Sequence, residues 1–179
     1  MLKLDFKLSL DTPFENTLAI SRYQRFWDQN QAQIVDSFTK HTGLKFRQRK
    51  ITVRAIDEHT SRAGNSSKPM ELNRYLSGEA IGPNLIHELA HRLVIGNGIV
   101  TSDNNPAWTY HSHRHIDLFL YDVWVDVVGK AAADKALSDE RSNGYDYYKK
   151  AWDWALNKSY ADRQKTINKL KSRSQNLAK

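Results

Sequence analysis

The chain has 179 residues, 40% of them hydrophobic and 26% charged, with no cysteine and a formal net charge of +7. These values fit one soluble domain with its own core, and they exclude disulfides and cysteine metal ligands. No apolar run approaches the eighteen or so residues of a membrane span, and the first residues lack the apolar core of a signal peptide. We therefore expect a cytoplasmic protein that has no membrane partner.

The positive charge is concentrated at the C-terminal end. Residues 158–179 contain seven Lys or Arg and one acid, so they carry +6, whereas the other 157 residues sum to +1. We predict a single domain over residues 1–157 and a basic helical tail over 158–179. A second basic cluster consists of Lys45, Arg47, Arg49, Lys50 and Arg54. Such clusters are typical of phosphate binding, so nucleic acid is a candidate partner, although a solvated terminal helix is the simpler explanation of the tail.

The first part of the chain predicts helices combined with a small sheet. Apolar and charged residues alternate over 3–10, which is the period of a half-buried strand, and helical spacing follows over 12–42. Alternation returns over 44–55 and predicts one strand or a strand pair. A polar loop over 57–69 then leads to a short strand, Met70–Asn73. We expect an α+β fold in which a small mixed sheet packs on helices.

A predicted helix that begins near Pro83 and ends near Gly96 carries two histidines four residues apart, His87 and His91. This spacing places both imidazoles on one helix face, where they can reach a single Zn²⁺ ion. Glu88 lies beside the first histidine and is placed to accept a proton from a zinc-bound water. We predict that His87 and His91 bind zinc and that Glu88 is the general base.

Catalytic zinc normally has three protein ligands and one position open for water. A strongly apolar helix is predicted over 112–130, and His115, Phe119, Asp122 and Asp126 would share one narrow face of it. Buried His and Asp side chains are costly unless they are paired or bind metal. We therefore predict His115 as the third ligand, and Asp122 as the acceptor for the ring N–H of a ligand histidine.

Other candidates for the third ligand remain open. Asp122 or Asp126 could bind the metal directly and is the main rival to His115. His111 and His113 are expected to be loop residues that do not bind it. Glu140 lies in a polar stretch that is predicted to be a turn, which makes it a weak candidate.

The order of a strand region, a short strand and an HExxH helix resembles the core of the zincin metallopeptidases. This resemblance implies a zincin-like fold, hydrolysis of peptide bonds, and a substrate that pairs with the edge of the strand before the metal helix. The metzincin pattern HExxHxxGxxH is excluded, because Val94 and Asn97 stand where it requires Gly and His. The spacing from His115 to Phe119 is similar to that of the SprT-like minimal zincins, in which a later His-x-x-x-aromatic begins a helix. This second resemblance covers residues 70 to about 130.

The predicted function is a zinc-dependent metallopeptidase that acts on a peptide or protein. Glu88 would take a proton from the zinc-activated water as it attacks a peptide carbonyl, and would then pass the proton to the leaving amine. Residues 1–157 would form the zincin-like catalytic domain. The alternative is a non-catalytic module that keeps this scaffold and binds nucleic acid or a partner protein through the basic tail.

Overall fold

The computed structural model describes residues 2–7, 14–65, 67–100 and 106–177. This part of the chain forms seven α-helices, one short 3₁₀ helix and three strands, in this order: β1 (Lys3–Phe6), α1 (Phe14–Thr42), β2 (Lys50–Ile56), β3 (Met70–Asn73), η1 (Gly78–Ala80), α2 (Ile81–Gly96), α3 (Pro106–Ile116), α4 (Leu120–Val128), α5 (Lys130–Arg141), α6 (Asp146–Leu156) and α7 (Tyr160–Leu177). The combination of helices with a small sheet confirms the predicted α+β class at this level. None of the described helices has both the length and the hydropathy needed to cross a membrane.

The sheet has the order β1-β2-β3, and both pairs of strands are parallel. The mixed sheet predicted from the sequence is therefore wrong for the named strands. The reason lies in the connections, because α1 and then the 57–69 loop each return the chain to the end of the sheet where the previous strand began. An isolated antiparallel bridge joins Arg62 of that loop to Glu71 of β3. Of the two alternatives predicted over 44–55, one strand or a strand pair, the structure has the single strand β2, which begins at Lys50.

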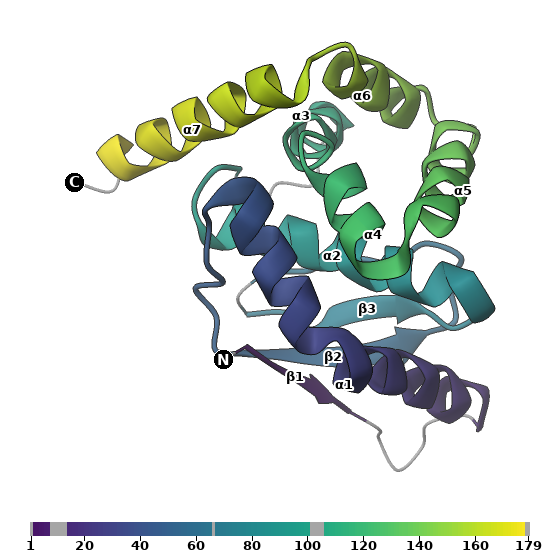
Figure 1. Cartoon of the computed structure of the whole chain (residues 1–179). Coiled ribbons are helices and arrows are strands. Elements are labelled where there is room, and N and C mark those ends of the chain that lie inside the picture. Colours follow the sequence, from purple (N-terminus) through teal and green to yellow (C-terminus); the bar gives the residue numbers. More distant parts are fainter. Residues whose placement is uncertain (1, 8–13, 66, 101–105, 178–179) are drawn as a thin grey trace.

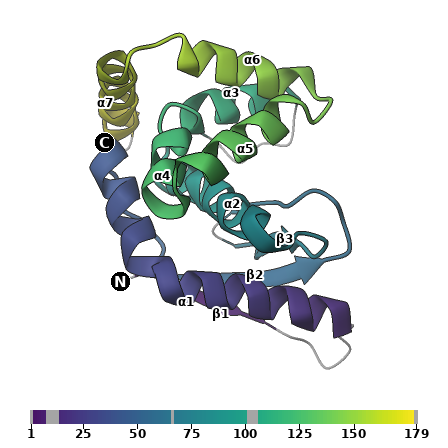
Figure 2. The ribbon, with the colours of Figure 1, turned by 45° about the vertical axis from the view of Figure 1, so that its right-hand side comes forward.

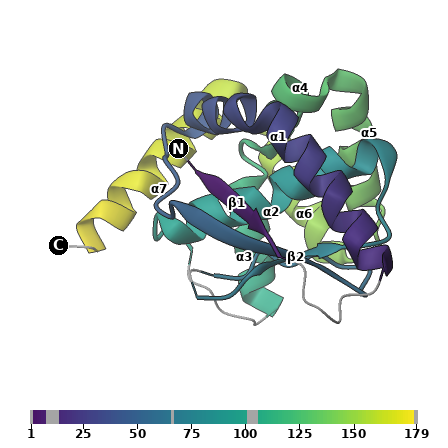
Figure 3. The same ribbon diagram turned by 90° about the horizontal axis from the view of Figure 1, so that it is seen from below.

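One face of the sheet is buried, as the alternation of buried and exposed residues along β2 shows. Ile51, Val53 and Ala55 are buried, while Lys50, Thr52 and Arg54 are exposed. Helix α2 lies between the sheet and the helices α3 to α6 (Figures 1 and 2), whereas Figure 3 shows β1 and β2 from the opposite side. Helix α2 is therefore covered on both sides, and most of its residues are buried. The HExxH residues therefore lie on a helix that is buried over most of its length.

The apolar helix predicted over 112–130 is interrupted in the structure. Helix α3 ends at Ile116 and α4 begins at Leu120, and the three residues between them form turns. The N–H of Phe119 bonds to the carbonyl of Ile116 at 3.0 Å, a tighter pattern than that of an α-helix. All five residues from 116 to 120 are at most 1% exposed. One straight helix at a surface cannot bury every side, and the change of direction allows each of these side chains to reach the core.

The basic tail forms α7, which lies against the C-terminal end of α1 (Figure 2). The side-chain amide of Gln164 donates a hydrogen bond of 2.8 Å to the carbonyl of His41, and Ile167 is buried. Arg163 forms an ion pair of 3.1 Å with Asp122 of α4. These contacts attach the described part of the tail to two helices of the body.

Candidate metal centre

Helix α2 places His87 and His91 one turn apart, as their spacing predicts, with their Nε2 atoms 3.1 Å from each other. The Nδ1 atom of each ring is engaged elsewhere: that of His87 lies 2.6 Å from Glu140 Oε1, and that of His91 lies 2.8 Å from Ser112 Oγ. Two nitrogens that bind one tetrahedral zinc ion at about 2.05 Å are roughly 3.3 Å apart. The two Nε2 atoms are therefore close to the separation that a shared metal requires.

His113 of α3 is the third member of the group. Its ring centroid lies 4.9 Å from that of His91 and 5.3 Å from that of His87. All three histidines are buried, and each offers a nitrogen within 4.8 Å of those of the other two. Three buried histidines thus lie close enough to hold a metal ion. Imidazole ligands suit zinc and also copper, iron and nickel, so the geometry leaves the identity of the metal open.

The sequence predicts His115 as the third ligand, but the structure places His115 outside this group of histidines. Residues two apart on a helix point about 200° away from each other, so α3 can turn only one of His113 and His115 toward α2. His115 is half-buried, and burial, together with Arg114 and His111, lowers its pKa to about 4. On this geometry His113 takes the place that the sequence assigns to His115.

The carboxylate beside the histidines is also a different one. The sequence predicts that Asp122 accepts a hydrogen bond from a ligand histidine, but Asp122 pairs with Arg163, between α4 and α7. Glu140 takes that position beside His87, and its second oxygen accepts a hydrogen bond of 2.9 Å from Trp152 Nε1. The stretch around Glu140 is the last turn of α5 rather than the predicted turn between elements. Asp126, the other predicted candidate, pairs with Lys40 and His41 of α1.

The protonation of the histidines follows from these contacts. Burial holds the pKa of His91 well below its usual value, and the neighbouring His113 and His87 add to this effect. Burial by itself would also lower the pKa of His87, but the carboxylate of Glu140 outweighs it and raises this pKa to about 9. His91 is therefore neutral near pH 7, the form that binds metal, whereas His87 must release a proton when a metal binds.

Glu88 is buried on the same helix, beside His87. Burial raises the pKa of its carboxyl group to about 7, although His87 opposes this shift. The side chain can therefore change its protonation state near neutral pH, which is what a general base or acid requires.

The group of histidines opens into a cleft of about 790 Å³. One wall consists of the segment from Thr60 to Asn65, and the opposite wall includes Tyr147 and Tyr148 of α6. The Tyr148 ring lies edge-on to His113 with a centroid distance of 4.3 Å. Burial raises the pKa of Tyr148, so its hydroxyl remains protonated at any physiological pH. Arg92 of α2 donates a hydrogen bond of 2.5 Å to the carbonyl of Lys68 and thereby fixes the loop on the first wall.

Comparison of the chain with protein-family models, with curated proteins and with solved structures gave no match. A function for this cleft therefore has to be argued from its own geometry and chemistry.

The contact between Glu140 and His87 leads to a testable prediction. A carboxylate that orients a metal-binding histidine typically contributes 10- to 100-fold to metal affinity. We expect Glu140→Gln to weaken zinc binding by roughly that factor, measured by competition with a chromogenic chelator. The matched control is Asp122→Asn, because Asp122 pairs with Arg163 between α4 and α7 instead of with His87. A larger loss of zinc affinity in the Asp122 variant would contradict the assignment of Glu140.

Proposed function

We propose that this protein is a zinc-dependent hydrolase and, more specifically, a metallopeptidase. The observation that carries the proposal is the group formed by His87, His91 and His113, with Glu88 beside it in an open cleft. Three neutral imidazoles leave the full +2 charge on the metal, which favours strong acidification of water. The HExxH spacing and its resemblance to the zincins support zinc over other metals and peptide bonds over other substrates.

His87, His91 and His113 would hold the ion, and zinc bound there would supply acidification of water and polarisation of a carbonyl. Glu88 takes a proton from the attacking water and delivers it to the leaving amine. Glu140 and Ser112 accept the Nδ1–H groups of His87 and His91, so that both rings present Nε2 to the metal. These hydrogen bonds determine the tautomers that binding requires.

The borders of the cleft support an extended peptide as the substrate. The zincin resemblance implies that substrate pairs with the outer edge of the strand before the metal helix, which is β3 here. At Glu71 this edge is already bonded to Arg62, with N–H to carbonyl distances of 2.7 and 2.8 Å. Arg62 directs both of its backbone groups toward β3, and the segment from Ser61 to Ala63 lines the cleft beside it. We propose that substrate pairs with the segment from Ser61 to Ala63.

The metal requirement provides the first test of this function. The purified protein should bind about one zinc ion per chain by elemental analysis, in accord with a single three-histidine site. Zinc-loaded protein should cleave members of a mixed peptide library, a chelator should abolish the cleavage, and added zinc should restore it. If the protein binds zinc but cleaves no peptide, the peptidase proposal is wrong and the histidines form a metal site with another function. Cleavage that a chelator does not affect would contradict the metal mechanism.

A further inference from the structure

The two basic clusters of the sequence each contain cations that are paired within the fold and cations that are not. Lys50 pairs with Asp5 at 2.8 Å, and Arg163 of α7 pairs with Asp122 at 3.1 Å. Other members have no carboxylate within 4.0 Å among the described residues, and these include Lys45, Arg47, Arg49, Lys169, Lys171 and Arg173. The uncompensated charge of both clusters is therefore available to a ligand.

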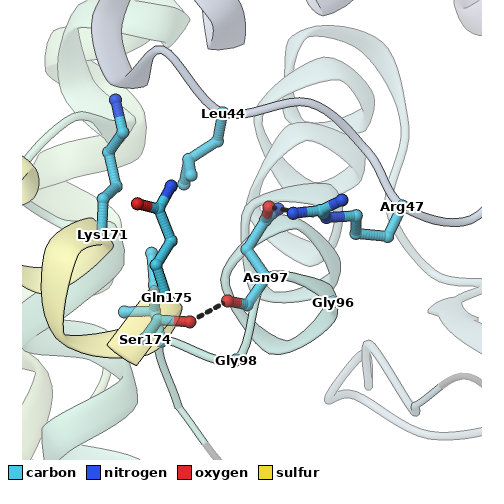
Figure 4. A pocket seen from close by; sticks show the side chains of 9 residues that line it. Leu44, Arg47, Gly96, Asn97, Gly98, Lys171, Ser174 and Gln175 are labelled. Atoms are coloured by element: carbon cyan, nitrogen blue, oxygen red, sulfur yellow. Dashed lines mark hydrogen bonds between the residues drawn. The ribbon is translucent and has the colours of Figure 1, made fainter. Parts of the chain in front are cut away.

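Two of these cations, Arg47 and Lys171, line a second pocket of about 550 Å³, where the C-terminal half of α7 faces the segment that follows α1 (Figure 4). Figure 4 shows Lys171 and Arg47 on opposite sides of the pocket, with Asn97 and Gln175 between them. None of the nine described residues that line it is acidic. The pocket shares no lining residue with the cleft of the histidines, so it is a separate site.

The two cations are held in place by neutral groups. The Arg47 Nε–H donates a hydrogen bond of 3.3 Å to Asn97 Oδ1, and the hydroxyl of Ser174 donates to the backbone carbonyl of Asn97. Lys171 Nζ lies against Gly43, where a Cβ atom would be only 2.6 Å away. Gly43 has a φ of 63°, so the position both requires glycine and leaves space for the ammonium group. The charges are thus positioned before any ligand arrives.

We propose that this pocket binds a backbone phosphate of a nucleic-acid strand. Arginine and lysine supply the charge that phosphate oxygens require, and the side-chain amide of Gln175 adds a neutral donor. The Asn97 amide holds Arg47 in place and donates its own hydrogens to the carbonyls of Lys45 and Leu93. Lys169 and Arg173 each lie two residues from Lys171 on α7 and therefore point away from the pocket, so Arg47 and Lys171 are the two cations that contact the phosphate. All these contacts are with the backbone, so binding is independent of the nucleotide sequence.

A membrane surface fits the same charges less well. Proteins that lie on anionic membranes combine basic residues with large apolar side chains that enter the lipid. The exposed large hydrophobic residues among those described are Phe14, Leu18, Tyr75, Tyr145, Leu156 and Tyr160, and none of them lines this pocket. Tyr160 is the member of this set on α7, and it lies at the opposite end of that helix from Lys171.

The test measures binding of the full chain to a labelled DNA strand of about twenty nucleotides by fluorescence anisotropy over a range of salt concentrations. The pocket variant is Arg47→Gln with Lys171→Gln. Its matched control is Arg25→Gln with Lys149→Gln, which removes the same two charges from exposed residues of α1 and α6 that do not line the pocket. We expect the pocket variant to bind at least roughly tenfold more weakly, and the slope of log K against log salt to fall by about 1.5. The control variant should lose much less affinity.

Several results would overturn the proposal. Equal losses in the two double variants would mean that the charge acts diffusely, and undetectable DNA binding by the unmodified protein at low salt would exclude the site altogether. Binding to phosphatidylserine vesicles but not to DNA would identify a lipid headgroup as the ligand. Complete displacement of DNA by an equal concentration of inorganic phosphate would identify a site for the free ion. A lower melting temperature with unchanged DNA affinity would mean that Lys171 only stabilises the end of α1.

The histidine cleft supplies an independent control. His113→Ala should leave DNA affinity unchanged, because His113 lines the cleft and not the pocket, and the two share no lining residue. The proposal of a nucleic-acid site and the proposal of a hydrolase can therefore be contradicted independently of each other.

Discussion

Replacing His113 with alanine should abolish high-affinity zinc binding, whereas replacing His115 should leave it nearly unchanged. His113 belongs to the buried group with His87 and His91, and His115 lies outside it. Loss of one of three ligands removes a metal–nitrogen bond, so it should cost well beyond the 10- to 100-fold that is typical of an orienting residue. The measurement is the zinc dissociation constant of each variant, obtained by chelator competition.

The two substitutions form a matched pair, since both remove an imidazole from the same helix at positions two residues apart. Circular dichroism and thermal melting should show that each variant remains folded in the metal-free state. Burial and the surrounding charges keep His115 neutral, so its removal does not leave an unpaired charge in the protein. If His115→Ala has the larger effect on zinc affinity, α3 presents the other face to α2 and the geometry proposed here is wrong.

Glu88→Gln should retain zinc but lower kcat for peptide hydrolysis by roughly 10²- to 10⁴-fold, the usual contribution of a general base. Glutamine has nearly the same size but cannot accept the proton of the attacking water. Elemental analysis should give the same zinc content as the unmodified protein, and kcat should be measured on any peptide that the unmodified protein cleaves. Undiminished turnover would contradict the role of Glu88. Glu79→Gln, a change at an exposed glutamate just before α2, controls for the loss of a negative charge.

The role of Glu88 as a general base also predicts the direction in which the rate of hydrolysis changes with pH. A general base has to be ionised, so hydrolysis should increase with pH through the pKa of Glu88 and then level off. Without metal, burial raises that pKa to about 7. A bound zinc ion favours the ionised carboxylate, so the increase should occur below pH 7 in the zinc-loaded protein. In Glu88→Gln this acidic limb of the rate profile should disappear.

The sequence alone predicts the part of the candidate site that lies on one helix. Helical periodicity is fixed by the backbone, so the four-residue spacing places His87 and His91 on one face whatever packs around them. The Nε2 separation of 3.1 Å confirms that placement. The alternation of Ile51, Val53 and Ala55 likewise predicts the buried face of β2, because successive side chains of a strand point to opposite sides. Both inferences depend on residues that are close in sequence.

The sequence also contains a pattern that indicates the third histidine, although the number of residues between it and the HExxH helix does not reveal it. Ile116 is the single aliphatic residue between 110 and 116, so the buried face of a helix there must include it. Residues three and four positions earlier, His113 and Ser112, share that face, whereas His115 does not. Both are buried in the structure. The assumption of one continuous helix over 112–130 concealed this pattern by aligning His115 with Asp122.

Tertiary structure alone decided which residues complete the site and which basic residues meet. Glu140 reaches His87 from α5 and Ser112 reaches His91 from α3, across separations of 53 and 21 residues. Arg47 and Lys171 face one pocket although 124 positions separate them. Such contacts depend on how helices pack and where the chain turns, as at residues 117–119, and these outcomes follow from the burial of the whole core rather than from any local period. The sequence determined the chemistry of one helix, and the packing of the other helices against it determined its partners.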